Sequence, residues 1–278
     1  IAHFPLAFLD PGDVSLVPEP GYPVYHIGTL LAGGTSHFMP LLERNGFLPD
    51  LGAIPGQALE KAKLLYLNYP NNPTGVCAPG EFLREAIRFC KKHGLILVYD
   101  AAYAEMFYGG KRPVSFLSIP GAKDVGIEFH SLSKTCNMTG WRVGWACGNA
   151  DLVRGLATLK ENIDSGTFEA LQIAGIECLS GPQNDVTDLR AIYQRRRDVL
   201  VEGLKKLFPG VTIPEATFYL WLKTPGDGTE FARTLLEKAQ IVVTPGIGFG
   251  PSGKEYVRFA LTIGEEKIRQ ALTRMENL

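Results

Sequence analysis

The sequence reads SLSKTCNMTGWR from Ser131 to Arg142, a short polar loop between two apolar segments. These segments, Val125 to Phe129 and Val143 to Cys147, are typical of buried strands. A lysine tethered between two strands has little freedom, so Lys134 is a candidate for a residue held in place for chemistry. Ser131 and Arg142 flank it with a hydroxyl and a guanidinium, which are groups that suit a phosphate.

A lysine beside a phosphate site is what a pyridoxal-phosphate enzyme requires, because the amine forms a Schiff base with the cofactor's aldehyde. The alternative for Lys134 taken alone is a surface lysine in a polar turn, since most lysines are solvated. Further segments of the chain favour the first interpretation.

The run LILVY from Leu95 to Tyr99 consists of β-compatible residues and is followed by Asp100. A carboxylate at the C-terminal end of a strand lies where open α/β sheets bind their ligands. Asp100 is therefore a candidate partner for a protonated ring nitrogen, and Tyr103, three residues on, a candidate donor to the cofactor's phenolate oxygen. The alternative for Asp100 is a helix N-cap, a position that aspartate favours.

Another buried-strand run, Leu64 to Leu67, precedes the stretch YPNNPTG from Tyr69 to Gly75. Pro73 disfavours helical backbone at Asn72, so the Asn72 amide is held in a turn and can reach the same phenolate oxygen. A plain strand-to-helix turn accounts equally for these residues.

The assembled motifs resemble those of the fold-type I, class I/II pyridoxal-phosphate aminotransferases, and the resemblance covers essentially the whole chain. The motifs occur in that family's order: NPTG at Asn72 to Gly75, DAAY at Asp100 to Tyr103, SLSK at Ser131 to Lys134, Arg142, and the strand-like YVRF at Tyr256 to Phe259. Five ordered elements rarely match by chance. The resemblance implies pyridoxal 5'-phosphate as cofactor and transamination as the reaction.

The same resemblance implies a role for each matching residue at the reacting end of the cofactor. Lys134 corresponds to the Schiff-base lysine that also moves the proton, and Asp100 to the partner of the ring nitrogen. Asn72 and Tyr103 correspond to the residues that bind the phenolate oxygen.

The remaining matches concern the phosphate, the face of the cofactor ring and the substrate. Ser131 and Arg142 correspond to phosphate-binding residues, and Tyr22 to an aromatic residue that stacks on the ring. Arg258 corresponds to the arginine that binds the substrate's α-carboxylate, with Asn72 beside it. A bidentate fork is the physical reason for arginine at this position and not lysine.

Within the family, three segments are most similar to the LL-diaminopimelate aminotransferases: Leu67 to Gly75, His130 to Arg142, and Asn162 to Gly166. Such enzymes interconvert tetrahydrodipicolinate plus glutamate with LL-diaminopimelate plus 2-oxoglutarate, on the route to lysine. Cys136 departs from the pattern, which has an aromatic residue there.

Several other functions remain open at this point. Alanine, aspartate and aromatic aminotransferases share the cofactor-binding residues, and so does a C–S lyase of the same fold. A non-catalytic, aminotransferase-like sensor domain or an inactive fragment is the alternative of another class.

The first residues depart from the family. The chain opens at Ile1, and the apolar stretch to Leu9 lacks the basic region and cleavage site of a signal peptide. In the resembling family a glycine-rich phosphate cup and an N-terminal arm lie upstream of this point. A chain of these residues alone is expected to bind the cofactor weakly, because the cup supplies backbone N–H groups to the phosphate.

Composition points to a cytoplasmic enzyme. The net charge of −1 indicates no nucleic-acid partner, and no apolar run is long enough to span a membrane. The five cysteines show no C-x-x-C spacing, so we expect reduced thiols and no bound metal. By resemblance, we expect a homodimer with the active site at the subunit interface, acting on small amino-acid and 2-oxo-acid substrates.

Strand-like runs alternate with helical patterns, which predicts an α/β fold with a mostly parallel sheet sandwiched by helices. Residues 1–183 are expected to form part of a cofactor-binding large domain, and residues 184–278 a long linking helix and a smaller C-terminal α+β domain. The pattern predicts these helices and strands: helices at 81–92, 151–159, 169–179, 185–207, 229–240 and from 265, and strands at 218–222, from 241, and at 256–261.

Overall fold

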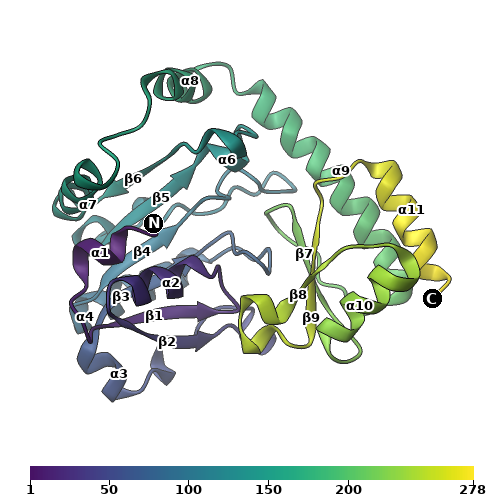
Figure 1. Ribbon diagram of the computed structural model, residues 1–278, viewed down its shortest axis with the longest axis horizontal. Coiled ribbons are helices and arrows are strands. Elements are labelled where there is room, and N and C mark those ends of the chain that lie inside the picture. The colour runs from purple at the N-terminus through teal and green to yellow at the C-terminus, as the bar shows by residue number, and fades with distance from the viewer.

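The computed structural model describes residues 1–278 and contains two sheets (Figure 1). The larger sheet has six strands in the order β2-β1-β3-β4-β5-β6. All neighbouring pairs are parallel except β5 and β6, so the predicted α/β fold with a mostly parallel sheet is confirmed. Its strands are β1 (Val14–Glu19), β2 (Thr35–Pro40), β3 (Ala62–Asn68), β4 (Ile96–Asp100), β5 (Gly126–Ser131) and β6 (Gly144–Gly148).

Helices cover both faces of this sheet, which explains why its central strands read as continuous apolar runs. In β3, Leu65 and Leu67 pack against one set of helices, whereas Leu64 and Tyr66 pack against the other. The first set is α3 (Gly56–Lys61), α4 (Gly80–His93) and α5 (Ala122–Val125), and the second is α1 (Phe4–Phe8), α2 (Val24–Leu31) and α7 (Ala150–Ile163).

Helix α4 forms where the sequence predicted it, and Gly94 ends it in the left-handed conformation at φ 66°. Two more helices follow the lysine loop. Helix α8 (Glu169–Ser180) agrees with the prediction, and α7 extends to Ile163, four residues beyond the predicted end at Leu159.

The second sheet is small and antiparallel, in the order β7-β9-β8, and lies with its helices on the right of Figure 1. Long helix α9 runs from the neighbourhood of α8 to this part of the molecule. These elements are β7 (Tyr219–Lys223), β8 (Thr244–Pro245), β9 (Tyr256–Ala260), α9 (Asn184–Leu207), α10 (Gly228–Ala239) and α11 (Glu265–Glu276).

One predicted strand is wrong in its extent. The strand expected from Ile241 is confined to Thr244 and Pro245. The Ile241 N–H instead donates to the carbonyl of Leu235, which completes the end of α10. Pro245 has no N–H to continue the ladder.

The expected domain boundary between residues 183 and 184 stays a prediction. One segment that precedes it in the sequence packs into the hydrophobic core around the small sheet. Tyr103, Met106 and Tyr108 join the core of the small sheet. The N–H of Thr217 donates to the carbonyl of Met106 at 2.7 Å. The segment after β4 therefore holds the two sheets against each other.

The expectation that all cysteines are free is wrong. Cys136 and Cys178 form a disulfide across a sequence separation of 42 residues, while Cys77, Cys90 and Cys147 are free. The sequence spacing conceals this pair because it forms only when α8 folds over the end of the lysine loop.

None of the helices combines the length and the hydrophobicity that a membrane-spanning helix needs.

Candidate active site

A cavity of about 500 Å³ lies at the carboxyl ends of β3, β4 and β5. The register of these strands places Asn68 opposite Asp100 and Asp100 opposite Phe129. The cavity wall brings together all the candidate residues from the sequence: Tyr22, Asn72, Asp100, Tyr103, Ser131, Lys134, Arg142 and Arg258.

Lys134 lies on the short helix α6 (Leu132–Thr135), which begins directly where β5 ends. Ser131 caps this helix, because its hydroxyl accepts a hydrogen bond from the Ser133 N–H at 3.2 Å. The Lys134 amine lies 5.9 Å from the ring centroid of Tyr103 and 5.8 Å from that of Phe218. This half-buried position excludes the alternative of a lysine in an exposed polar turn.

The surroundings lower the pKa of Lys134. Desolvation is the largest cause and the Arg142 guanidinium is the next, while the Asp100 carboxylate opposes the shift. A lower pKa means that a larger fraction of the Lys134 amine is neutral at a given pH, so more of it is available as a base and nucleophile than for an exposed lysine.

Asp100 is buried at the end of β4, and two hydrogen bonds hold its carboxylate. Oδ2 accepts from the Tyr25 hydroxyl at 2.6 Å, and Oδ1 accepts from the Ala102 N–H at 3.1 Å. Burial raises the pKa of Asp100, and these hydrogen bonds oppose the rise. The residues after Asp100 form a turn, so the alternative of a helix N-cap does not apply.

Tyr25 is a functional candidate that sequence reasoning missed. It is buried in α2 and stacks on Tyr66 with ring centroids 5.0 Å apart. Its contact with Asp100 spans 75 residues, and no local pattern marks it. Tyr22, which the sequence did indicate, is exposed at the cavity rim and lies edge-on to Tyr25.

Arg258 projects from β9 and connects the small sheet to the cavity. Its Nη1 donates to the Asn72 side-chain oxygen at 2.7 Å. Its guanidinium lies 3.9 Å from the ring centroid of Tyr219 and 4.6 Å from that of Phe249. The Arg258 Nε is buried without a hydrogen-bond partner. The guanidinium is thus fixed in place on the cavity wall, where its remaining Nη donors suit a carboxylate.

The other predicted residues occupy different parts of the wall. The Tyr103 hydroxyl donates to the Tyr219 hydroxyl at 3.3 Å. Arg142 adopts the left-handed conformation at φ 58°, and its Nη1 donates to the Thr139 carbonyl at 3.0 Å. Ser133, which the sequence did not single out, adds a second hydroxyl beside Ser131.

Comparison with known proteins decides the family. A model described as aminotransferase class I and II matches residues 1–275. The chain belongs to the class I and II aminotransferase family. The enzyme is therefore a transaminase.

Curated relatives extend this likeness over the whole chain. It is 54% identical to the LL-diaminopimelate aminotransferase of Moorella thermoacetica and 53% identical to that of Syntrophobacter fumaroxidans. In both cases the match covers 100% of this chain and 72% of the relative.

Solved structures have the same fold. The aminotransferase superposes on apo-BacF from Bacillus subtilis with a TM-score of 0.95 and 39% identity, covering 99% of this chain and 74% of that one. For an aspartate aminotransferase double mutant from Thermus thermophilus, the TM-score is 0.90 and the identity 32%. That match covers 99% of this chain and 72% of the other.

On β5 of the aminotransferase, just before the lysine helix, the buried Glu128 pairs with the half-buried His130. The Glu128 carboxylate accepts from His130 Nε2 at 2.8 Å and from the Ser115 hydroxyl. The His130 ring stacks on Trp145 with centroids 5.0 Å apart. These contacts fix the end of β5, from which the lysine helix begins.

We predict that Tyr25→Phe raises the pKa of Asp100, because the ring still stacks on Tyr66 while the hydrogen bond that favours the carboxylate is lost. Carbon-13 NMR titration of the labelled carboxyl in the cofactor-free protein measures the change. Tyr69→Phe is the control, since its hydroxyl donates to the Phe47 carbonyl instead. An Asp100 pKa that is the same in Tyr25→Phe and the unaltered protein would contradict the assignment.

Proposed function

We propose that this aminotransferase exchanges an amino group between LL-diaminopimelate and 2-oxoglutarate, with pyridoxal 5'-phosphate as cofactor. Support for the substrate comes from relatives named LL-diaminopimelate aminotransferase, which are more than half identical to this chain over its whole length. The observation that carries the chemistry is the half-buried Lys134 amine in one cavity with the Asp100 carboxylate and the Arg258 guanidinium.

The chemistry of the donors in the cavity fits pyridoxal phosphate. Asp100 offers a buried carboxylate for the ring nitrogen, and Lys134 offers an amine for the aldehyde. Ser131, Ser133 and Arg142 offer hydroxyls and a cation for the phosphate. When bound, the cofactor supplies an aldehyde and an electron-withdrawing ring.

Arg258 positions the substrate. Its Nη donors suit the two oxygens of an α-carboxylate. Asn72 holds the guanidinium from one side by a hydrogen bond, and the rings of Tyr219 and Phe249 cover it. These rings exclude water and strengthen the electrostatic attraction between the two charges.

Lys134 moves the proton. With its lowered pKa, the neutral amine removes the proton from the α-carbon of the amino donor. The resulting ammonium would pass that proton to the cofactor's C4' atom, and in the second half-reaction the amine would move a proton back from that atom to the α-carbon that receives the amino group. Tyr103 and Asn72 are the proposed partners of the cofactor's phenolate oxygen, and Tyr22 is proposed to stack on its ring.

We predict that Lys134→Ala lowers kcat for transfer from LL-diaminopimelate to 2-oxoglutarate by at least about 10²-fold to 10⁴-fold, the range for a lost acid–base group. Glutamate production measures the rate. Lys238→Ala, an exposed lysine on α10, is the control that keeps full activity. Transamination by Lys134→Ala at the unaltered rate would remove the proposed mechanism.

A donor panel decides between this substrate and its rivals. LL-diaminopimelate is expected to give a higher kcat/KM than alanine, aspartate or phenylalanine with the same acceptor. Release of pyruvate, ammonia and a thiol from a β-thioether amino acid such as cystathionine, without an acceptor, would indicate a C–S lyase instead. Cofactor binding without turnover of any donor would indicate a sensor domain.

We also propose that two copies form a homodimer through the outer face of α8, which stands away from the large sheet in Figure 1. Helix α8 and the segment before it expose large apolar side chains to a degree that is unusual for a free surface. These side chains are Ile163, Phe168, Ile173, Ile176 and Leu179.

A cytoplasmic location remains a prediction from composition.

The dimer is tested by placing charge on this face. We predict that Ile173→Glu combined with Ile176→Glu shifts the protein from dimer to monomer in analytical ultracentrifugation, because a charge cannot be buried there unpaired. Leu236→Glu on α10, where the leucine is similarly exposed, is the control and stays dimeric. A double variant that sediments as a dimer would place the interface elsewhere.

A further inference from the structure

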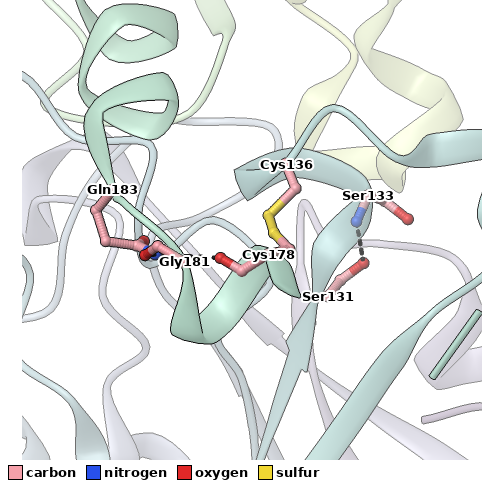
Figure 2. Close-up of a disulfide and its surroundings, with 6 residues drawn as sticks. All are labelled: Ser131, Ser133, Cys136, Cys178, Gly181 and Gln183. Carbon is pink, nitrogen blue, oxygen red and sulfur yellow. Dashed lines mark hydrogen bonds between the residues drawn. A yellow bond between two sulfur atoms is a disulfide. The ribbon is translucent and has the colours of Figure 1, made fainter. Parts of the chain in front are cut away.

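Two cysteines from distant parts of the chain meet beside the catalytic lysine. Figure 2 shows the sulfur–sulfur bond between Cys136, at the end of α6, and Cys178, in α8. Cys136 follows Lys134 by only two positions. The Cα atoms of the pair are 6.7 Å apart, which is within the range that a disulfide spans.

Little else ties α8 to the lysine loop. Gly175 is the only buried residue of α8, and it allows a close approach to Leu132 of α6. Gln183 donates to the carbonyls of Cys178 and Gly181, which closes the end of α8 on itself. Three of the four large apolar side chains of α8 are exposed: Ile173, Ile176 and Leu179. The bond between Cys136 and Cys178 is therefore the main tie between these two segments.

We propose that Cys136 and Cys178 form a thiol–disulfide exchange site, whose redox state sets how firmly the loop bearing Lys134 is held. In the disulfide state, Cys136 is fixed to α8, and the segment from Lys134 to Arg142 is restrained close to its start. In the dithiol state, that restraint is absent and the segment samples more conformations.

The exchange partner is a small dithiol. Its two S–H bonds are replaced by one S–S bond, while the Cys136–Cys178 bond breaks and two S–H bonds form. Two electrons and two protons pass from the dithiol to the protein. The reverse reaction uses a small disulfide such as oxidised glutathione, which receives the same electrons and protons.

The structure gives such a reagent access to this pair. Both cysteines are half-buried and line a cavity of about 490 Å³. Cys178 also lines a neighbouring cavity of about 530 Å³. By contrast, Cys90 is fully buried, and burial raises the pKa of Cys77 to about 12, so that thiol forms little reactive thiolate.

Thiol counting tests the site independently of enzyme activity. After treatment with oxidised glutathione, alkylation and mass spectrometry of the unfolded protein should find three free thiols, and five after a dithiol. Cys136→Ser and Cys178→Ser should each abolish this two-thiol difference, whereas Cys147→Ser should keep it. Five free thiols under both treatments, or a bridge between other cysteines, would overturn the proposal.

Hydrogen exchange tests the effect on the loop. Amides of residues 132–142 should exchange about threefold or more faster in the dithiol state, because a restraint on the loop is lost. The same acceleration should be present in Cys136→Ser under oxidising conditions and absent at α11, which is remote. Equal exchange in a protein whose disulfide is verified by mass would overturn the tethering role.

A consequence for the cofactor rests on the proposed function. Pyridoxal phosphate should leave the dithiol state faster than the disulfide state, as followed by absorbance. The two states could release the cofactor at equal rates although their hydrogen exchange at residues 132–142 differs. That result would count against the assignment of Lys134 and Arg142 to the cofactor, and not against the disulfide.

Discussion

The active site depends on the register of three parallel strands. β3, β4 and β5 end at the same edge of the sheet, and their pairing sets Asn68 opposite Asp100 and Asp100 opposite Phe129. Because side chains alternate along a strand, a slip of one residue would turn Asp100 to the other face of the sheet. The two apolar layers on either side of the sheet prevent such a slip, since each strand buries different side chains on each face.

This geometry concentrates charge where water is scarce. Tyr25 and the Ala102 N–H keep the buried Asp100 carboxylate hydrogen-bonded. Desolvation and the neighbouring arginines favour a neutral Lys134. The small sheet adds Arg258, already fixed by Asn72, from a position late in the chain. Groups that are ordinary on a surface thus share one cavity, where we propose that they act as a base, a partner for the cofactor ring and a site for a carboxylate.

Local patterns were sufficient to predict much of this arrangement. Continuous apolar runs predicted β3, β4 and β5, because strands buried on both faces have no polar side. The carboxylate of Asp100 at the end of its run predicted a ligand site at that edge of the sheet, whereas Tyr22 and Arg258 were expected there only from the resemblance to the family.

Other features depend on contacts that no local pattern encodes. The Tyr25–Asp100 hydrogen bond and the Cys136–Cys178 disulfide join residues 75 and 42 positions apart, respectively. The aromatic rings that enclose Arg258 come from β7 and from the loop before β9. The short β8 reflects the way in which α10 ends, which depends on tertiary packing and not on β propensity.

The pKa of Lys134 in the cofactor-free protein is the decisive quantity, because the proposed chemistry of the cavity requires a lysine amine that loses its proton readily. Reductive methylation with carbon-13 formaldehyde, followed by NMR titration, measures it alongside exposed lysines such as Lys238. Desolvation, together with the Arg142 and Arg258 guanidinium groups, outweighs the opposing Asp100 carboxylate and predicts a pKa for Lys134 below that of those lysines. A value equal to theirs or higher would contradict the convergence of these groups on one amine.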